Sequence, residues 1–73
     1  MILNGVSWTV KFVEPDDWSL RTSSGGYAIG VCDNNYREIY IHNRLPTELM
    51  RKVICHEIAH AAMFSYGVLL DIE

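Results

Sequence analysis

The chain has 73 residues, of which 49% are hydrophobic, and a formal net charge of −3 at pH 7. This length predicts one small domain over residues 1–73, with a thin core that a bound metal would help to stabilise. The negative charge and the six scattered Lys and Arg residues argue against nucleic-acid binding. No apolar run approaches the roughly 20 residues needed to cross a membrane, and no secretory signal pattern is present, so we expect a cytoplasmic protein.

The first predicted element is a strand over residues 6–13. Apolar and polar residues alternate there, and β-branched and aromatic types are frequent, which is typical of a half-buried strand. Pro15 ends this pattern because proline has no N–H to donate to a strand ladder. The polar residues that follow favour a turn or one short helical turn.

Two further strand patterns follow, over residues 27–32 and 38–43. Between them, residues 33–35 are Asp-Asn-Asn, which tolerate left-handed backbone conformations. This arrangement predicts a β-hairpin. We expect the segment Glu38 to Asn43 to be an edge strand of the sheet.

The last predicted element is a long helix. Pro46 suits its first turn, and Gly67 offers a left-handed cap just after Tyr66. Together the elements predict an α+β fold, in which a small antiparallel sheet of about three strands packs on this one helix.

The predicted helix carries the pattern His-Glu-x-x-His at residues 56–60. Histidines four residues apart project from one helical face, so His56 and His60 can bind the same metal ion. Neutral imidazoles bind Zn²⁺ without cancelling its charge, and that charge lowers the pKa of a bound water to roughly 7. Glu57 is placed to take a proton from this water. The pattern therefore predicts a zinc hydrolase.

The surroundings of the pattern support this interpretation over that of two surface histidines with a solvated glutamate between them. After Lys52 the helix contains no other charged residue except Glu57. On a helical wheel, Leu49 and Val53 share a stripe with the two histidines, which predicts that the histidines face inward and that Glu57 lies on the flank. Buried polar groups need partners, and a metal ion would supply one.

The order of strand, short Pro-containing connection and His-Glu-x-x-His helix resembles the zincin metallopeptidases. The second half of the chain is most similar to short bacterial and phage domains of the ImmA/IrrE type, in which a strand like Ile39-Tyr40-Ile41-His42-Asn43 precedes the zinc helix. The resemblance implies Zn²⁺ on His56 and His60, Glu57 as general base and acid, and a peptide or protein substrate paired beside the edge strand. The exposed backbone of an edge strand also favours such pairing on physical grounds.

Zincins of this kind use a third protein ligand, often a glutamate on a later helix. Downstream of His60 only Asp71 and Glu73 carry a carboxylate. Glu73 is the preferred candidate, because a chain reversal at Gly67 can return it toward the histidines. The alternatives are a water, a second copy of the chain in a homo-oligomer, or a helix beyond residue 73.

Several other side chains receive structural interpretations. We expect Cys32 and Cys55 to be small buried side chains rather than a disulfide or a zinc pair. His42 is interpreted as a residue on the polar face of its strand, and Tyr40 and Tyr66 as packing residues with solvated hydroxyl groups rather than as oxyanion donors.

Three functional hypotheses remain from the sequence. The first is zinc-dependent hydrolysis of peptide bonds by Glu57 and a water held on zinc. The second is a binding or regulatory module that keeps the zincin scaffold without turnover, because a third ligand is not evident. The third is a structural domain whose histidines pack without a metal.

Overall fold

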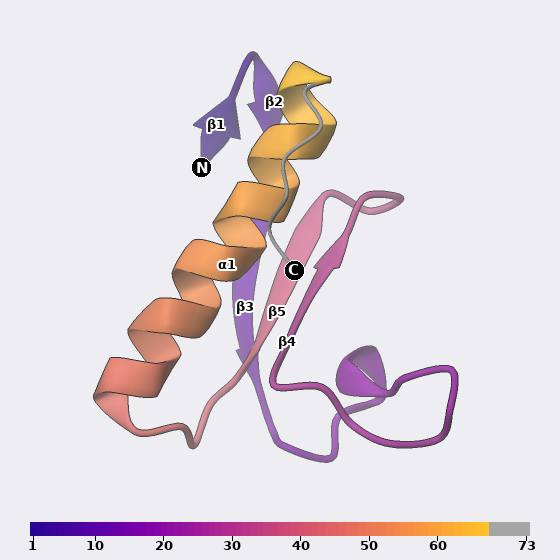
Figure 1. Ribbon diagram of the computed structural model, residues 1–73. Coiled ribbons are helices and arrows are strands. Elements are labelled where there is room, and N and C mark those ends of the chain that lie inside the picture. Colours follow the sequence, from indigo (N-terminus) through magenta and orange to yellow (C-terminus); the bar gives the residue numbers. More distant parts are fainter. Residues whose placement is uncertain (68–73) are drawn as a thin grey trace.

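A computed structural model describes residues 1–67. It contains five short strands, one 3₁₀ turn and one long helix, which confirms the predicted α+β class (Figure 1). The elements, in chain order, are β1 (Ile2–Leu3), β2 (Val6–Ser7), β3 (Thr9–Val13), η1 (Trp18–Leu20), β4 (Gly30–Asp33), β5 (Glu38–His42) and α1 (Thr47–Tyr66). Within residues 1–67, no helix is long and apolar enough to cross a membrane.

The main sheet has three strands in the order β3-β5-β4, and it is mixed rather than antiparallel. β4 pairs with β5 in antiparallel fashion, as a hairpin requires, but β3 and β5 run parallel. The expectation that residues 38–43 form an edge strand is therefore wrong, because β5 is hydrogen-bonded on both sides. The edges of this sheet, within residues 1–67, are β3 and β4.

The predicted strand over residues 6–13 is divided at Trp8. Val6 and Ser7 form β2 and pair with β1 in a separate two-stranded hairpin, whereas β3 enters the main sheet. Asn4 and Gly5 join β1 to β2 and both have positive φ angles, of 50° and 76°. Such Asn-Gly turns match the right-handed twist of the strands that they connect.

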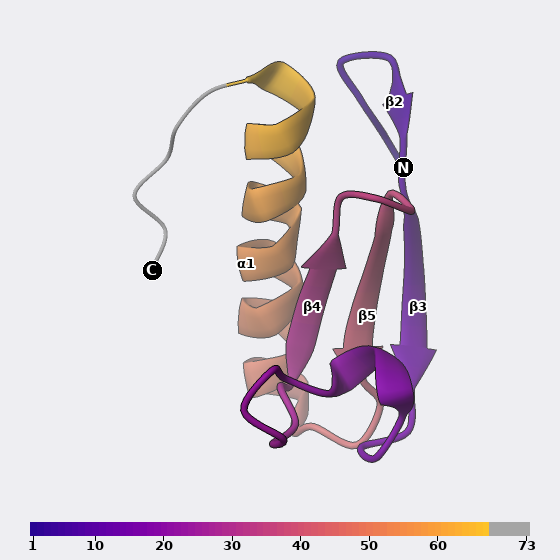
Figure 2. The same ribbon diagram turned by 90° about the vertical axis from the view of Figure 1, so that its right-hand side faces the viewer.

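Helix α1 covers one face of the main sheet (Figure 2). The core between them contains Ile39 and Ile41 of β5, which are fully buried, together with Trp8, Val53 and Ala61. The segment that contains η1 contacts β4 and β5, and its Leu20 is also fully buried. Because side chains alternate along a strand, Tyr40 of β5 faces away from α1.

The ends of α1 lie where the sequence predicts them. The helix runs over 20 residues after Pro46, which occupies the N-cap position. Gly67 follows in the left-handed conformation with a φ angle of 67°, and its N–H donates to the Met63 carbonyl. This geometry favours glycine because other residues pay a steric penalty at positive φ.

Candidate metal centre

The two histidines of α1 converge on one point. His56 Nε2 and His60 Nε2 lie 3.1 Å apart, and their ring centroids lie 4.7 Å apart. Two nitrogen ligands at about 2.0–2.1 Å from a tetrahedral zinc ion are separated by about 3.3 Å. The imidazole pair therefore fits two positions of a zinc site with little rearrangement. His56 is exposed and His60 is half-buried, so the point between them is open to solvent.

The predicted orientation of the helix is wrong in one respect. Glu57 lies on the inward face, between Val53 and Ala61, and is only 8% exposed. The histidines lie on the flank instead, and Leu49, which was expected to share their inward stripe, is 40% exposed. The true inward stripe repeats every four residues from Val53, which places the glutamate rather than the histidines against the sheet.

This position affects the acid–base chemistry of Glu57. Burial raises the pKa of its carboxyl group, because removal from water disfavours the charged form. The neighbouring charges of His60 and His56 act in the opposite direction and lower that pKa. Burial is the larger of these two effects, so the pKa of Glu57 lies above the usual value for a glutamate.

Strand β4 approaches Glu57 through Gly30. A Cβ atom on Gly30 would lie 2.6 Å from Val53 Cγ1 and 3.1 Å from both Cγ and Oε2 of Glu57. Contacts below 3.0 Å force a neighbour to move. The absence of a side chain at position 30 therefore allows β4 to lie directly against the part of α1 that bears the motif.

Within residues 1–67, the outer side of β4 has backbone groups that no other strand pairs with. His42 N–H donates to the Ile29 carbonyl, and Gly30 lies opposite Ile41. Hydrogen-bonded and non-hydrogen-bonded residue pairs alternate along an antiparallel ladder. Because Ile29 and His42 form a hydrogen-bonded pair, Gly30 makes no backbone hydrogen bond to β5, and neither does Cys32, two residues later. The N–H and C=O groups of Gly30 and Cys32 consequently point to the outer side of β4.

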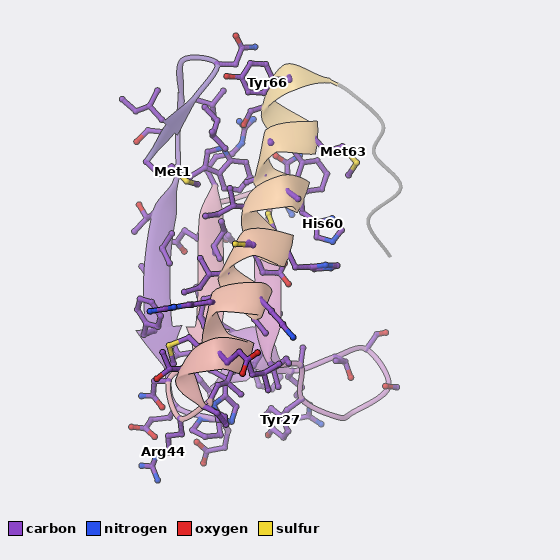
Figure 3. The ribbon with its side chains drawn as sticks, turned by 60° about the vertical axis from the view of Figure 1, so that its left-hand side comes forward. Met1, Tyr27, Arg44, His60, Met63 and Tyr66 are labelled. Atoms are coloured by element: carbon purple, nitrogen blue, oxygen red, sulfur yellow. The ribbon has the colours of Figure 1, made fainter. Side chains whose placement is uncertain are left out.

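A pocket of about 600 Å³ lies between this part of β4 and the helix. His56 and Glu57 line one end of it. Figure 3 shows His60 and Tyr27 on the same side of α1, with Met1 on the other. The remaining lining residues come from the segment before β4, from the first residue of β4 and from the preceding turn of α1: Tyr27, Ala28, Ile29, Gly30, Lys52 and Val53.

Residues 1–67 do not supply a ready third ligand. No group of three His, Cys, Asp or Glu side chains within that range is arranged to hold a metal ion. Glu73 and Asp71, the two carboxylates proposed for this role, lie outside the described residues. The convergent histidines thus fit zinc as a two-residue part of a site.

The other polar candidates are engaged elsewhere. His42 Nδ1 accepts the Arg44 N–H at 3.0 Å. The Tyr40 hydroxyl donates to Glu38 on the face of the sheet opposite α1, and the Tyr66 hydroxyl accepts the Asn4 N–H at 3.2 Å. None of these three joins the pair formed by His56 and His60.

The cysteines were predicted only in part. Both are free. Cys32 is half-buried, and burial raises the pKa of its thiol to about 11, with further contributions from Glu57 and Asp33. Cys55 is exposed, so its predicted burial is wrong. Cys55 precedes His56 in α1 and lies on the side of the helix that faces away from the sheet.

Comparison with known proteins adds no relative to this picture. No protein-family model, curated protein or solved structure matches the chain.

Proposed function

We propose that this chain is a zinc-dependent peptide hydrolase with a minimal zincin-like architecture. The observation that carries the proposal is the convergence of His56 Nε2 and His60 Nε2, 3.1 Å apart, beside the buried Glu57. Two imidazoles and one carboxylate are the residue types that metal-assisted hydrolysis requires.

His56 and His60 would hold the zinc ion, with Glu73, a water or a second copy of the chain completing its ligands. Zinc bound there supplies a Lewis acid that polarises a carbonyl group and makes a water molecule more acidic. Convergence of the two Nε2 atoms before binding limits the conformational entropy that metal binding must cost.

Glu57 acts as the general base and then as the general acid. Its carboxylate takes a proton from the attacking water and later delivers that proton to the leaving amine. The packing of Glu57 against β4 fixes the side chain at the inner edge of the site.

The substrate would bind as an extended peptide along the outer side of β4. The N–H and C=O groups of Gly30 and Cys32 point in that direction and can pair with a peptide backbone. This corrects the expectation that the peptide pairs with residues 38–43, since both sides of β5 are already occupied. Gly30 of this edge lines the same pocket as His56, which supports binding of the peptide near the proposed zinc site.

Two free cysteines among the described residues support a reducing, cytoplasmic setting.

The test is a comparison of peptide cleavage by wild-type protein and by Glu57→Gln, both loaded with zinc. The amide keeps the shape of the side chain but cannot accept the proton, so we expect turnover to fall at least about 100-fold while zinc content stays the same. Equal cleavage by both proteins would contradict the role of Glu57. Mass spectrometry of a mixed peptide library identifies the cleaved bonds.

A second candidate is a zincin-like binding or regulatory module without turnover. It is favoured by one observation, the lack of a third ready ligand within residues 1–67. The two candidates differ in one outcome: the module binds zinc and peptide, but wild-type protein leaves the whole library intact.

A further inference from the structure

The pocket beside the histidines is lined by one charged residue, Lys52, that the proposed chemistry of hydrolysis does not use. Its lining is apolar at Ala28, Ile29 and Val53, and two ionic side chains face it. One of them, Glu57, is buried at the end next to the histidines. The other, Lys52, stands one helical turn before His56.

We infer that Lys52 makes this groove selective for peptides that carry a carboxylate side chain near the scissile bond. This inference rests on the proposed function for the position of the scissile bond, but the pocket and its charge do not depend on turnover. An acidic substrate residue would place its stem on the apolar lining and its carboxylate at the Lys52 ammonium.

The position of the acidic residue follows from helix and strand geometry. Four residues of helix, from Lys52 to His56, correspond to about 6 Å along the axis. An extended peptide rises about 3.3 Å per residue. A peptide on β4, which lies beside α1 (Figure 2), would therefore meet Lys52 about two residues from the bond that lies at the histidines.

Lys52 is available for this role. Its ammonium lies 4.0 Å from Glu48 Oε1, and the side chains of both residues are largely exposed, at 74% and 89%. Exposed ion pairs of this kind contribute little, so a substrate carboxylate competes with Glu48 at small cost.

The neighbouring Arg51 provides a matched control. It carries the same charge on the same helix and is exposed, but it does not line the pocket. Changing Arg51 or Lys52 to Gln alters the net charge of the protein equally. A preference that depends on overall charge responds to both changes, whereas a preference set in the pocket responds only to Lys52.

The experiment measures binding rather than turnover. Fluorescent seven-residue peptides that differ at one position, occupied by Glu, Gln or Lys, are titrated into zinc-loaded Glu57→Gln protein, and each position is scanned in turn. We expect Glu to bind about three- to fivefold more tightly than Gln at one position, which is the size expected of a partly exposed ion pair. Lys52→Gln should abolish that preference, Lys52→Glu should reverse it toward Lys, and Arg51→Gln should retain it.

Equal binding of the Glu and Gln peptides at every position would overturn the inference, as would loss of the preference in Arg51→Gln. The titration is repeated after a chelator has removed the zinc, so that failure of the charged pocket can be distinguished from failure of the proposed hydrolase. A Lys52-dependent preference in protein that neither retains zinc nor cleaves peptides supports the charged pocket and contradicts the hydrolase. Cleavage without any such preference supports the hydrolase and contradicts the charged pocket.

Discussion

Two of the contacts that helix α1 makes with the rest of the molecule differ in character. Near its C-terminal end it packs on the N-terminal hairpin and on the buried Trp8 that follows it, whose Nε1 donates to Ser65 Oγ at 2.7 Å. Asn4 adds a hydrogen bond from Nδ2 to the Ser65 carbonyl at 2.9 Å. Near its middle, α1 meets β4 through a glycine on one side and a buried carboxylate on the other.

The first contact stabilises the fold, whereas the second places Glu57 at the proposed site at a cost in stability. The contact around Trp8 combines a large apolar side chain with satisfied hydrogen bonds, which is how a small domain gains stability. The contact between Gly30 and Glu57 gives up apolar area and buries a charged group, which lowers stability. Proteins accept such costs at functional sites. Loss of the Trp8 side chain should therefore lower the free energy of unfolding, whereas replacement of the Glu57 carboxylate by an apolar side chain should raise it.

The largest expected effect is at the first contact. Trp8→Ala should lower the free energy of unfolding by about 3–5 kcal/mol, because it removes a buried aromatic side chain and leaves a cavity. Urea denaturation followed by circular dichroism measures this change. Trp18→Ala is the control: Trp18 is 77% exposed, and its loss should cost no more than about 0.5 kcal/mol. Similar losses in both variants would contradict the importance of the Trp8 contact.

The second effect concerns the close approach of β4 to α1. Gly30→Ala should cost about 1–3 kcal/mol, because the new methyl group overlaps Val53 Cγ1 and crowds Glu57. The cost should be smaller when Val53 is already Ala, since the overlapping atom is then absent. Gly26→Ala serves as the control, because its Cβ would meet only Thr22 Oγ1 at 3.6 Å. If Gly30→Ala costs as much in the Val53→Ala background as in wild type, the methyl group does not overlap Val53, and β4 lies farther from α1 than the 2.6 Å contact requires.

The third effect has the opposite sign. Glu57→Met should raise the free energy of unfolding by about 0.5–2 kcal/mol, because an apolar side chain of similar size replaces a partly desolvated carboxylate. The same variant should lose peptide hydrolysis. Glu48→Met tests whether removal of any acidic residue has this effect; Glu48 is 89% exposed, so little change is expected. If Glu57→Met is destabilising, the carboxylate contributes to the fold and the contrast between the two contacts fails.

The smallest effect probes the same contact without changing its packing. At pH 8, a maleimide should modify the exposed Cys55 at least about tenfold faster than Cys32, because the reactive form is the thiolate and burial raises the pKa of Cys32 to about 11. As the pH rises from 8 toward 11, the Cys32 thiolate fraction increases and the difference between the rates should narrow. Peptide mapping by mass spectrometry follows the two sites separately. Equal rates at pH 8 in the folded protein would mean that the contact between β4 and α1 opens readily.

Much of the local structure follows from the sequence. The helix and its Gly67 cap, the β4–β5 hairpin and the short helical turn after Pro15 are set by periodicity, glycine conformation and short-range hydrogen bonds. All of them are confirmed, although β4 begins at Gly30 rather than at Tyr27. The N-terminal hairpin was missed although Asn4-Gly5 is a strong turn signal. Two-residue strands are too short to show an alternating pattern, so only the turn itself could have indicated them.

The arrangement of the sheet and the orientation of the helix could not be predicted in the same way. Alternation identifies a strand but not its partner, so the parallel pairing of β3 with β5 and the central place of β5 remained undetermined. The helical wheel indicated one inward stripe, through the histidines, whereas the neighbouring stripe through Val53, Glu57 and Ala61 is the buried one. Gly30 explains the difference, because its missing side chain leaves room for Glu57 against β4, and a distant glycine gives no signal in the helix sequence.

The most direct test of the account is the zinc content of the purified protein, prepared without an affinity tag. Inductively coupled plasma mass spectrometry measures it for wild type and for three variants: His56→Ala, His60→Ala and His42→Ala. The account predicts about one zinc per chain, or one per two chains if two copies share the site, in wild type and in His42→Ala. His42 lies outside the histidine pair and accepts a backbone hydrogen bond from Arg44. Loss of zinc is expected in both α1 variants, provided circular dichroism shows that they remain folded. Absence of zinc from wild type, even after dialysis against zinc, or retention of zinc in both α1 variants would contradict the metal centre.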